Sequence, residues 1–318
     1  MELRLHAGWA LRQMNKLKGA VVGVGYLGHF HAQKIKSHPM AELIGVCDFS
    51  LTQAQKIASD LNTKVFEKPN QLIGQVDFVH VVTSTQAHHE MSQLFLENKI
   101  PVLVEKPIAA TISQAQELCA LAKKNQTIFT VGHIERFNPA FQYLKEHSQG
   151  IRYLEMNRLA PFRSRGSDVS VLHDLTIHDM DLLNWIFNSK IKKHSVTGSN
   201  VVRPTIDDVS IRLELENGTQ VTINNSRIYP NIQRNFRFVK NNEVQVVNTA
   251  TLEVEMVKPL TEDPYQTVTK HTLEKKDALA LEVDHFIRAV RGEHPVMITG
   301  EEALLALKQV EQFVTEIS

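Results

Sequence analysis

Between residues 19 and 136, short apolar runs alternate with amphipathic segments of helix length. The apolar runs are residues 20–24, 42–48, 64–66, 76–82, 101–105 and 127–131, and the helical segments are residues 29–38, 52–61, 87–99 and 113–125. Strands that are apolar at nearly every position are typical of sheets buried on both faces, and intervening helices provide the crossovers that parallel strands need. The pattern predicts an α/β domain with a doubly wound parallel sheet.

The rhythm changes after residue 151. Polar and apolar side chains alternate over residues 151–159, 209–228, 235–241 and 243–249, as in antiparallel strands with one open face. Asn217-Gly218 predicts a hairpin turn within the second of these stretches. Helices are expected over residues 171–187, 277–291 and 301–317. The second domain is therefore predicted to be α+β, with a large, mostly antiparallel, open-faced sheet.

Length and composition set the boundaries of this picture. A chain of 318 residues is too long for one ordinary core. We divide it into an extension (1–17), a parallel-sheet domain (18–136) and a second domain (137–318). The last helix of the second domain can pack back on the parallel-sheet domain. The extension is expected to be loosely held.

Charge and cysteine usage exclude several classes of protein. Basic and acidic residues balance at 35 each, so the charge pattern of a nucleic-acid-binding protein is absent. No apolar run reaches the roughly 20 residues of a membrane span, and the first residues lack the apolar core of a signal peptide. Cys47 and Cys119 each lie in an apolar run and are expected to be buried thiols of a reducing compartment. A cytoplasmic protein is expected.

A glycine-rich turn joins the first predicted strand to the first helix. Gly23, Gly25 and Gly28 form a complete GxGxxG, in which glycines permit a tight turn and close approach of the backbone to a diphosphate at the helix N-terminus. Asp48 follows twenty residues after Gly28 and ends the second strand, where it can accept hydrogen bonds from ribose hydroxyls. These features predict a Rossmann domain that binds NAD in preference to NADP, because a carboxylate repels a 2′-phosphate. Tyr26 and Leu27, inside the motif, are expected to contact the cofactor.

Lys106 stands directly after the fifth buried strand. The carboxyl ends of parallel strands form the ligand-binding edge of such sheets. Pro107 restricts Lys106 to extended backbone conformations and so directs its side chain. We expect Lys106 to be catalytic.

A second candidate group lies in the helix predicted over residues 171–187. Asp174, His178 and Asp181 are spaced to share one helix face, so that a carboxylate can orient an imidazole acting as general base. Asp179 points about 100° away from His178 at helical spacing, and is expected to be a solvent-facing or capping group. A metal site at His173, Asp174, His178 and Asp181 is the weaker alternative, because hydride transfer assisted by a lysine needs no Lewis acid, and no metal is expected.

The order of motifs along the chain resembles the glucose–fructose oxidoreductase, inositol dehydrogenase and rhizopine catabolism (Gfo/Idh/MocA) family. The motifs are, in sequence order, the glycine turn, Asp48, "TSTQAHHE" (83–90), "VLVEKP" (102–107), "VGHIERFNPA" (131–140) and the Asp174-xxx-His178 spacing. The resemblance runs along nearly the whole chain from Lys18. It implies that Lys106 and His178 are the catalytic pair with Asp174 as their partner. It also implies a structural role for Glu105 at the strand end and, in many members, a cis peptide before the proline. Further cofactor contacts are implied for Thr83, Ser84, His88, Glu105 and Lys106, although Ser84 replaces the usual proline.

Within the family, the chain is similar to the branch that acts on nucleotide-linked N-acetyl sugars in lipid A synthesis. The segments that carry this similarity are "GHIERFNPAF" (132–141), "FRSRGSD" (162–168) and "NNSR" (224–227). The implied reaction is NAD-dependent oxidation of the C3 hydroxyl of a sugar such as UDP-N-acetylglucosamine. His178, assisted by Lys106, would remove the hydroxyl proton while a hydride passes to the nicotinamide. Arginines suit a diphosphate. The residues expected to bind the substrate are Arg136, Asn138, Arg163, Arg165, His178 and Arg227.

Three other functions remain open at this point. A dehydrogenase of a free sugar or of inositol, an NAD-dependent glycosidase, and a non-catalytic NAD-sensing regulator are all compatible with the same fold. Accumulation of NADH on addition of a sugar nucleotide separates the dehydrogenase from the glycosidase, which reoxidises its cofactor in each cycle. The open sheet face of the second domain is expected to mediate a homodimer or homotetramer, and neither a nucleic acid nor a membrane is expected as a partner.

Overall fold

The computed structural model describes residues 16–162, 169–260 and 266–317, and the chain divides into two compact units. The first unit extends to Ile134 and also takes in Leu279–Leu304, whereas the second comprises Glu135–Ala278 and the residues from Leu305 onward. The first unit thus includes a segment from late in the chain, which contains most of α8 (Ala278–Val290). The predicted extension lies largely outside the described residues.

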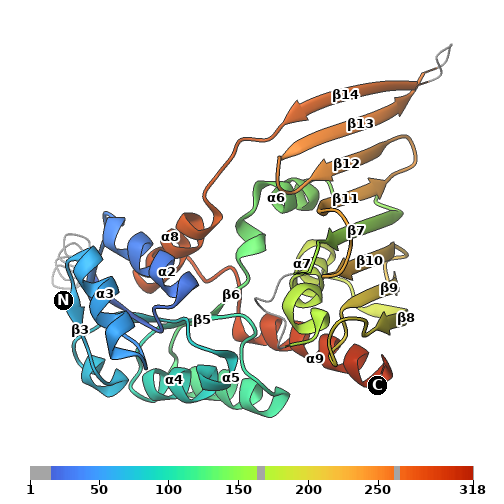
Figure 1. Ribbon diagram of the computed structural model, residues 1–318. Helices are drawn as coiled ribbons and strands as arrows, with labels where there is room; N and C mark the ends of the chain where they lie inside the picture. The colour runs from blue at the N-terminus through green and yellow to red at the C-terminus, as the bar shows by residue number, and fades with distance from the viewer. Residues whose placement is uncertain (1–15, 163–168, 261–265, 318) are drawn as a thin grey trace, which may run out of the picture. The chain divides into compact units, whose positions relative to one another are not determined.

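The first unit is built on a 6-stranded sheet in the order β3-β2-β1-β4-β5-β6 (Figure 1). All pairings between these strands are parallel. The strands are β1 (Leu17–Val22), β2 (Ala41–Cys47), β3 (Lys64–Val65), β4 (Phe78–Val81), β5 (Val102–Glu105) and β6 (Phe129–Gly132). The helices are α2 (Tyr26–Ser37), α3 (Leu51–Leu61), α4 (Thr85–Glu97) and α5 (Ile112–Asn125), with a short helix η1 (Pro69–Leu72). The strand order reverses next to β1, as in a doubly wound nucleotide-binding sheet, and this confirms the predicted fold.

Helices cover both faces of this sheet (Figure 1). On one face, apolar side chains of α2, α3 and α8 pack with those of β1, β2, β4 and β5 in one buried cluster. Val283, Phe286 and Ile287 of α8 are at most 1% exposed. Helix α8, from late in the chain, therefore completes a core that the N-terminal segment begins. On the opposite face lie α4 and α5, which pack against each other.

The second unit contains an 8-stranded sheet in the order β14-β13-β12-β11-β7-β10-β9-β8. Its strands are β7 (Tyr153–Leu159), β8 (Ile191–Ser199), β9 (Asp208–Leu215), β10 (Gln220–Ser226), β11 (Gln233–Val239), β12 (Val244–Asn248), β13 (Glu253–Pro259) and β14 (Gln266–Thr272). Only the β7–β10 pair is parallel among the described strands, so the prediction of a mostly antiparallel sheet is confirmed. Gly218, with φ of 87°, forms the predicted hairpin turn between β9 and β10.

One face of this sheet is packed and the other is open. Helices α6 (Pro139–Glu146) and α7 (Ile177–Phe187) lie on the packed side (Figure 1). On the open side, Ser210, Asn224, Asn157 and Asn235 form a row of hydrogen bonds across β9, β10, β7 and β11, at 2.9, 2.9 and 3.0 Å. The open face is thus polar and internally hydrogen-bonded.

The helix predicted over residues 171–187 begins with a wider turn. Residues Leu172–Thr176 (η3) form a π-helix, and α7 continues from Ile177. Such segments frequently occur at functional sites. Asp174 lies in the π-helical turn and His178 in the first turn of α7.

Both cysteines are buried and free, as predicted. Burial, reinforced by the charge of Asp48, raises the pKa of the Cys47 thiol to about 11, so this thiol is unreactive near neutral pH. Within the described residues, no helix combines the length and the apolar character needed to cross a bilayer.

Candidate active site

A cavity of about 730 Å³ opens at the carboxyl ends of β1, β2 and β4 in the first unit. It is lined by Val22, Gly23, Gly25, Cys47, Asp48, Phe49, Glu67, Pro69, Val82, Thr83, Ser84, Ala87, Glu90 and Met91. Of the residues that the sequence predicts to bind the cofactor, Gly23, Gly25, Asp48, Thr83 and Ser84 line this cavity. Its position at the strand-order switch is where parallel sheets of this kind bind ligands.

The glycine turn shapes the floor of the cavity. Gly23 has φ of 86°, a conformation that favours glycine. A Cβ on Gly28 would stand 1.9 Å from the carbonyl oxygen of Gly23, whereas a Cβ on Gly25 would meet no atom within 4 Å. Gly28 is therefore needed for packing of the turn, and Gly25 leaves open space in front of α2. Tyr26 and Leu27 are exposed on the first turn of α2, at 64% and 43%.

The N-terminus of α2 is suited to an anion. Gly25 caps the helix without a side-chain hydrogen bond, and the first turn carries no acidic residue. Backbone N–H groups at a helix start attract phosphate groups through hydrogen bonds and the helix dipole. Together with the space above Gly25, this arrangement fits the diphosphate of a dinucleotide.

Two alanine substitutions separate the packing role from the binding role of these glycines. Gly25→Ala should leave the melting temperature nearly unchanged but weaken NADH binding about tenfold or more, because the methyl group occupies the diphosphate position. Gly28→Ala should lower both the melting temperature and NADH affinity, because its Cβ collides with Gly23. Calorimetry and NADH fluorescence titration measure the two effects. Unchanged NADH affinity in Gly25→Ala would contradict this assignment of the diphosphate site.

Asp48 is held rigidly at the end of β2. One carboxylate oxygen accepts the backbone N–H of Val24 at 2.7 Å, and the other accepts that of Ser50 at 2.8 Å. These bonds orient the carboxylate at the cavity wall while leaving further lone pairs on both oxygens. The arrangement suits recognition of ribose hydroxyls, as the sequence predicts.

Lys106 follows β5 in the first unit and is half-buried. Its peptide bond to Pro107 is cis, in agreement with the family resemblance. Glu105 accepts the backbone N–H of Lys106 at 3.2 Å. Nδ1 of His88 lies 2.8 Å from the carbonyl oxygen of Pro107, and Nε2 lies 3.2 Å from that of Thr83. The backbone on both sides of Lys106 is therefore braced by buried side chains.

His88 is buried and contacts backbone carbonyl groups instead of facing the cavity. It is 1% exposed, so it does not line the cavity, although it holds the loop of Thr83 that does. Burial lowers the pKa of His88 below its ordinary value, against the opposing hydrogen bonds of Pro107 and Thr83. Both contacts are to carbonyl oxygens, so a neutral imidazole donates to one of them and a protonated imidazole donates to both.

In the second unit, Asp174 and His178 are both half-buried, whereas their neighbours Asp179 and Asp181 are fully buried. The expectation that Asp179 faces solvent or caps the helix is wrong. Its carboxylate accepts Nε of Arg158 at 2.6 Å and Nδ2 of Asn225 at 2.8 Å. Asp181 forms a buried ion pair with Arg136 at 2.6 Å.

A buried polar network fastens the start of α7 to the sheet. Arg158 of β7 joins Asp179 of α7 to Glu135, both at 2.6 Å, and Asn225 of β10 accepts the hydroxyl of Thr176 at 2.6 Å. Burial alone would lower the pKa of Arg158, but the two carboxylates outweigh it and the net shift is upward. For Glu135, burial raises the pKa and Arg158 outweighs it, so the net shift is downward. The network holds the residues on either side of His178.

Three other predicted substrate ligands are engaged in structural contacts. Arg136 has no exposed area, and its guanidinium is paired with Asp181. Arg227 pairs with Asp207 at 3.1 Å and donates to the carbonyl oxygens of Val169 and Ile206. Asn138 caps α6 through Ala140 and donates to Glu135. These placements argue against direct substrate contact by Arg136 and Arg227, while Arg163 and Arg165 lie outside the described residues.

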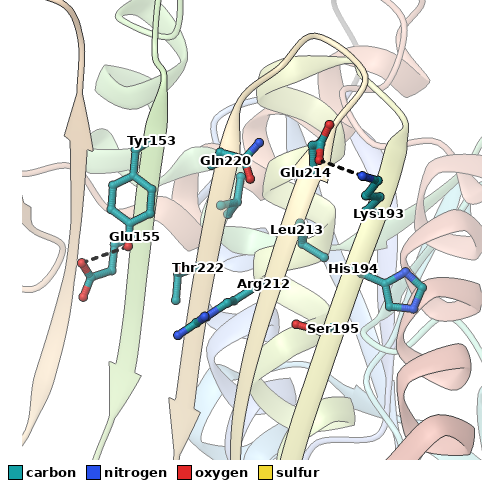
Figure 2. A pocket seen from close by; sticks show the side chains of 11 residues that line it. Tyr153, Glu155, Lys193, His194, Ser195, Arg212, Leu213, Glu214, Gln220 and Thr222 are labelled. Atoms are coloured by element: carbon teal, nitrogen blue, oxygen red, sulfur yellow. Dashed lines mark hydrogen bonds and ion pairs between the residues drawn. The ribbon is translucent and has the colours of Figure 1, made fainter.

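A second hollow lies on the open face of the second unit (Figure 2). Side chains of β7, β8, β9 and β10 line it, among them Tyr153, Arg212, Glu214 and Thr222. Lys193 lies 4.0 Å from Glu214, its partner on the neighbouring strand. It contains no member of the predicted catalytic set, and we do not assign the reaction to it.

The sequence does contain a signal for this buried network. Arg158 and Asn225 occupy inward-facing positions of β7 and β10, where the alternation calls for apolar residues, and they face each other in register. A polar residue at an inward position of an alternating strand marks a buried polar contact.

Comparison with known proteins identifies the family of both domains. Residues 17–133 match the oxidoreductase family with an NAD-binding Rossmann fold, and residues 148–249 match the GFO/IDH/MocA C-terminal domain. The chain is 30% identical over 311 residues to UDP-N-acetylglucosamine 3-dehydrogenase of Acidithiobacillus ferrooxidans, covering 93% of this chain and 97% of that protein.

Two further similarities extend this comparison. A solved structure of the Acidithiobacillus ferrooxidans enzyme has a TM-score of 0.87 and covers 96% of this chain and 98% of its own. Myo-inositol 2-dehydrogenase of Thermotoga maritima is 26% identical, covering 90% of this chain and 92% of that protein. The chain therefore belongs to the Gfo/Idh/MocA family of NAD-binding oxidoreductases, whose members act on the hydroxyl groups of sugars and inositols.

Proposed function

We propose that the protein oxidises the C3 hydroxyl of a nucleotide-linked N-acetyl sugar, UDP-N-acetylglucosamine or a close analogue, with NAD⁺ as hydride acceptor. The observation that carries the proposal is the similarity to UDP-N-acetylglucosamine 3-dehydrogenase over 97% of that protein's length. The inositol dehydrogenases are less similar, at 24–26% identity for two of them. A place in lipid A synthesis, in the cytoplasm, follows as part of the same proposal.

The reaction removes a hydride and a proton from a secondary alcohol. When bound, NAD⁺ accepts the hydride at the nicotinamide C4. His178 accepts the hydroxyl proton as general base, since imidazole is basic near neutral pH. Asp174, one helical turn before His178, orients the imidazole and stabilises its protonated form. Lys106 donates a hydrogen bond to the reacting oxygen and assists His178 in the transfer of the hydroxyl proton.

Cofactor choice is assigned to Asp48. Asp48→Ala should weaken NADH binding roughly tenfold, the value of a hydrogen bond to a charged group, and should improve NADPH binding relative to NADH. The Asp48→Asn variant retains one oxygen acceptor but lacks the charge, so it should keep part of the NADH affinity while reducing discrimination against NADPH. Fluorescence titration with both nucleotides measures the ratio. Stronger binding of NADPH than NADH by the wild-type protein would refute the assignment.

The diphosphate of the substrate needs cationic partners in this proposal. Arg163 and Arg165 keep that role, because guanidinium groups bind phosphate oxygens through paired hydrogen bonds. Arg136 and Arg227 are not included, since their guanidinium groups are committed to Asp181 and Asp207.

The direct test is NADH formation from NAD⁺ with UDP-N-acetylglucosamine, UDP-glucose, free N-acetylglucosamine and myo-inositol. We expect turnover with UDP-N-acetylglucosamine and little with the other three. Turnover of myo-inositol alone would favour the alternative, a polyol dehydrogenase like the inositol dehydrogenases. Sugar hydrolysis without net NADH would favour a glycosidase.

Self-association is assigned to the open face of the 8-stranded sheet. Its row of asparagine side chains offers donors and acceptors for a second copy of the chain, and a homodimer or homotetramer is proposed. A molar mass of one chain by light scattering at micromolar concentration would contradict this.

A further inference from the structure

Four buried titratable side chains meet behind the carboxyl end of β5 in the first unit. His31 comes from α2, His80 from β4, Glu105 from β5 and Glu282 from α8. His31, His80 and Glu282 are at most 3% exposed, and the side chain of Glu105 is 13% exposed. A polar group of this size inside an apolar core is costly unless its members satisfy one another.

A row of hydrogen bonds runs through this group to the backbone of Lys106. Nδ1 of His80 lies 2.9 Å from Nδ1 of His31, and Nε2 of His31 lies 3.0 Å from Oε1 of Glu105. The other oxygen of Glu105 accepts the backbone N–H of Lys106. Because a carboxylate only accepts hydrogen bonds, Nε2 of His31 carries the hydrogen.

Space for the Glu105 carboxylate comes from β6. A Cβ on Gly132 would stand 2.8 Å from Oε1 of Glu105, so any larger residue there would displace the carboxylate. The Glu105 side chain is therefore held between α2 and β6 in one position.

Glu282 completes the group from α8. A carboxylate oxygen of Glu282, one of Glu105 and a ring nitrogen of His31 lie within 4.8 Å of one another. Within the described part of the chain, neither oxygen of Glu282 has a conventional hydrogen-bond donor. The surroundings are apolar, since the ring of His80 is in contact with those of Phe78 and Phe286.

Two ionised carboxylates at this separation would repel each other strongly away from water. Burial, and then the charge of Glu105, raise the pKa of Glu282 well above its ordinary value. Burial also acts to raise the pKa of Glu105, but the hydrogen bond and charge of His31, with the charge of Lys106, outweigh it and the net shift is downward. The pKa values of the two carboxyl groups are thus shifted in opposite directions.

We propose that Glu282 is a neutral carboxylic acid that donates its proton in a hydrogen bond to the Glu105 carboxylate, and that this pair positions Lys106. The acid supplies the donor that Glu105 would otherwise lack on the α8 side, and Glu105 in turn fixes the backbone N–H of Lys106. Glu282 is a positioning residue that acts through Glu105, and its effect on turnover rests on the proposed role of Lys106.

Charged and titratable groups from several neighbouring elements surround the Glu105–Glu282 pair. His31 of α2 and Lys106 face Glu105 directly, His88 of α4 interacts with its charge, and His80 of β4 faces His31. A single shared proton keeps one negative charge in the group beside these donors. Loss of that proton, or of the Glu282 donor, changes the charge and the geometry next to Lys106 together.

Infrared spectroscopy tests the protonation state without any substrate. The difference spectrum of the wild-type protein minus Glu282→Gln at neutral pH should show the C=O stretch of a protonated carboxyl group. Asp284→Asn is the matched control on α8, because Asp284 pairs with His38 and Arg288 instead; its difference spectrum should lack that band. Absence of the band from the Glu282→Gln difference spectrum would overturn the proposal, whatever the enzyme's substrate proves to be.

Kinetics test the positioning role. Glu282→Gln should keep kcat within about threefold and keep the pH profile of kcat/KM, because an amide N–H replaces the acid O–H. Glu282→Leu removes the donor and should lower kcat about tenfold with the KM for NAD⁺ unchanged. Equal losses in both variants would show that Glu282 acts as a carboxylate and refute the proposal. Stoichiometric zinc in the wild-type protein that is absent from Glu282→Gln would also refute it, in favour of a metal site.

Discussion

Lys106→Ala is expected to lower kcat roughly 10²–10⁴-fold, the usual contribution of a positioned acid–base group. The reason is that Lys106 stands at the carboxyl end of β5, where Glu105 and His88 brace the backbone on either side of it. In the proposed reaction, this bracing restrains the lysine so that its ammonium group can meet the reacting oxygen. NADH binding should persist, because the glycine turn and Asp48 are untouched.

The control for this variant is Lys124→Ala, which removes an exposed lysine near the end of α5. It should turn over at the wild-type rate. Single-turnover measurements at saturating NAD⁺ separate the chemical step from product release. Hydride transfer at the wild-type rate in Lys106→Ala would rule out a role for this lysine in the reaction.

Arg158→Met is expected to lower the free energy of unfolding of the second unit by roughly 3–5 kcal/mol, the cost of removing one partner from a buried ion pair. The substitution leaves the carboxylates of Asp179 and Glu135 without their shared cation. Urea unfolding followed by the fluorescence of Trp185, in α7, reports on this unit. The control Arg237→Met breaks a pair with Glu155 in which the arginine side chain is 45% exposed, and should cost no more than about 1 kcal/mol.

The pH dependence of this effect has a definite sign. The pKa of Glu135 is lowered in the folded protein, so its pairing with Arg158 stabilises the fold at pH values above its ordinary pKa of 4.5. That stabilisation is lost as the pH falls below 4.5 and through the lower folded pKa. The difference in stability between wild type and Arg158→Met should therefore shrink on acidification. A difference that is constant or grows would contradict the assignment, as would equal urea midpoints for Arg158→Met and Arg237→Met.

The first unit was predictable because local pattern and global topology agree there. Each strand of the parallel sheet is a short apolar run, and the glycine turn identifies where β1 ends and α2 begins. The cis peptide at Lys106-Pro107 and the bracing by Glu105 also follow the family pattern. What the sequence could not show is that α8, far along the chain, completes this core and brings Glu282 to Glu105.

The second unit was less predictable. Strands β13 and β14 pair with each other, yet β14 is exposed at nearly every position and so lacks an apolar periodicity to detect. Alternation within β7 and β10 gives their facing sides but not their parallel pairing, which depends on strand order. Guanidinium groups suit a diphosphate, which favours Arg136 and Arg227 as substrate ligands, and helical spacing turns Asp179 away from His178. In the structure each of these charges is instead buried with a partner of opposite sign.

The most direct test of the proposed reaction uses UDP-N-acetylglucosamine carrying deuterium at C3. Incubation with NAD⁺ and the wild-type protein should transfer the deuterium to C4 of the nicotinamide and yield a 3-keto sugar nucleotide, with slower NADH formation than from the unlabelled sugar. Reduced cofactor without deuterium would show that the hydride comes from another carbon. No reduced cofactor at all from this substrate would contradict the account.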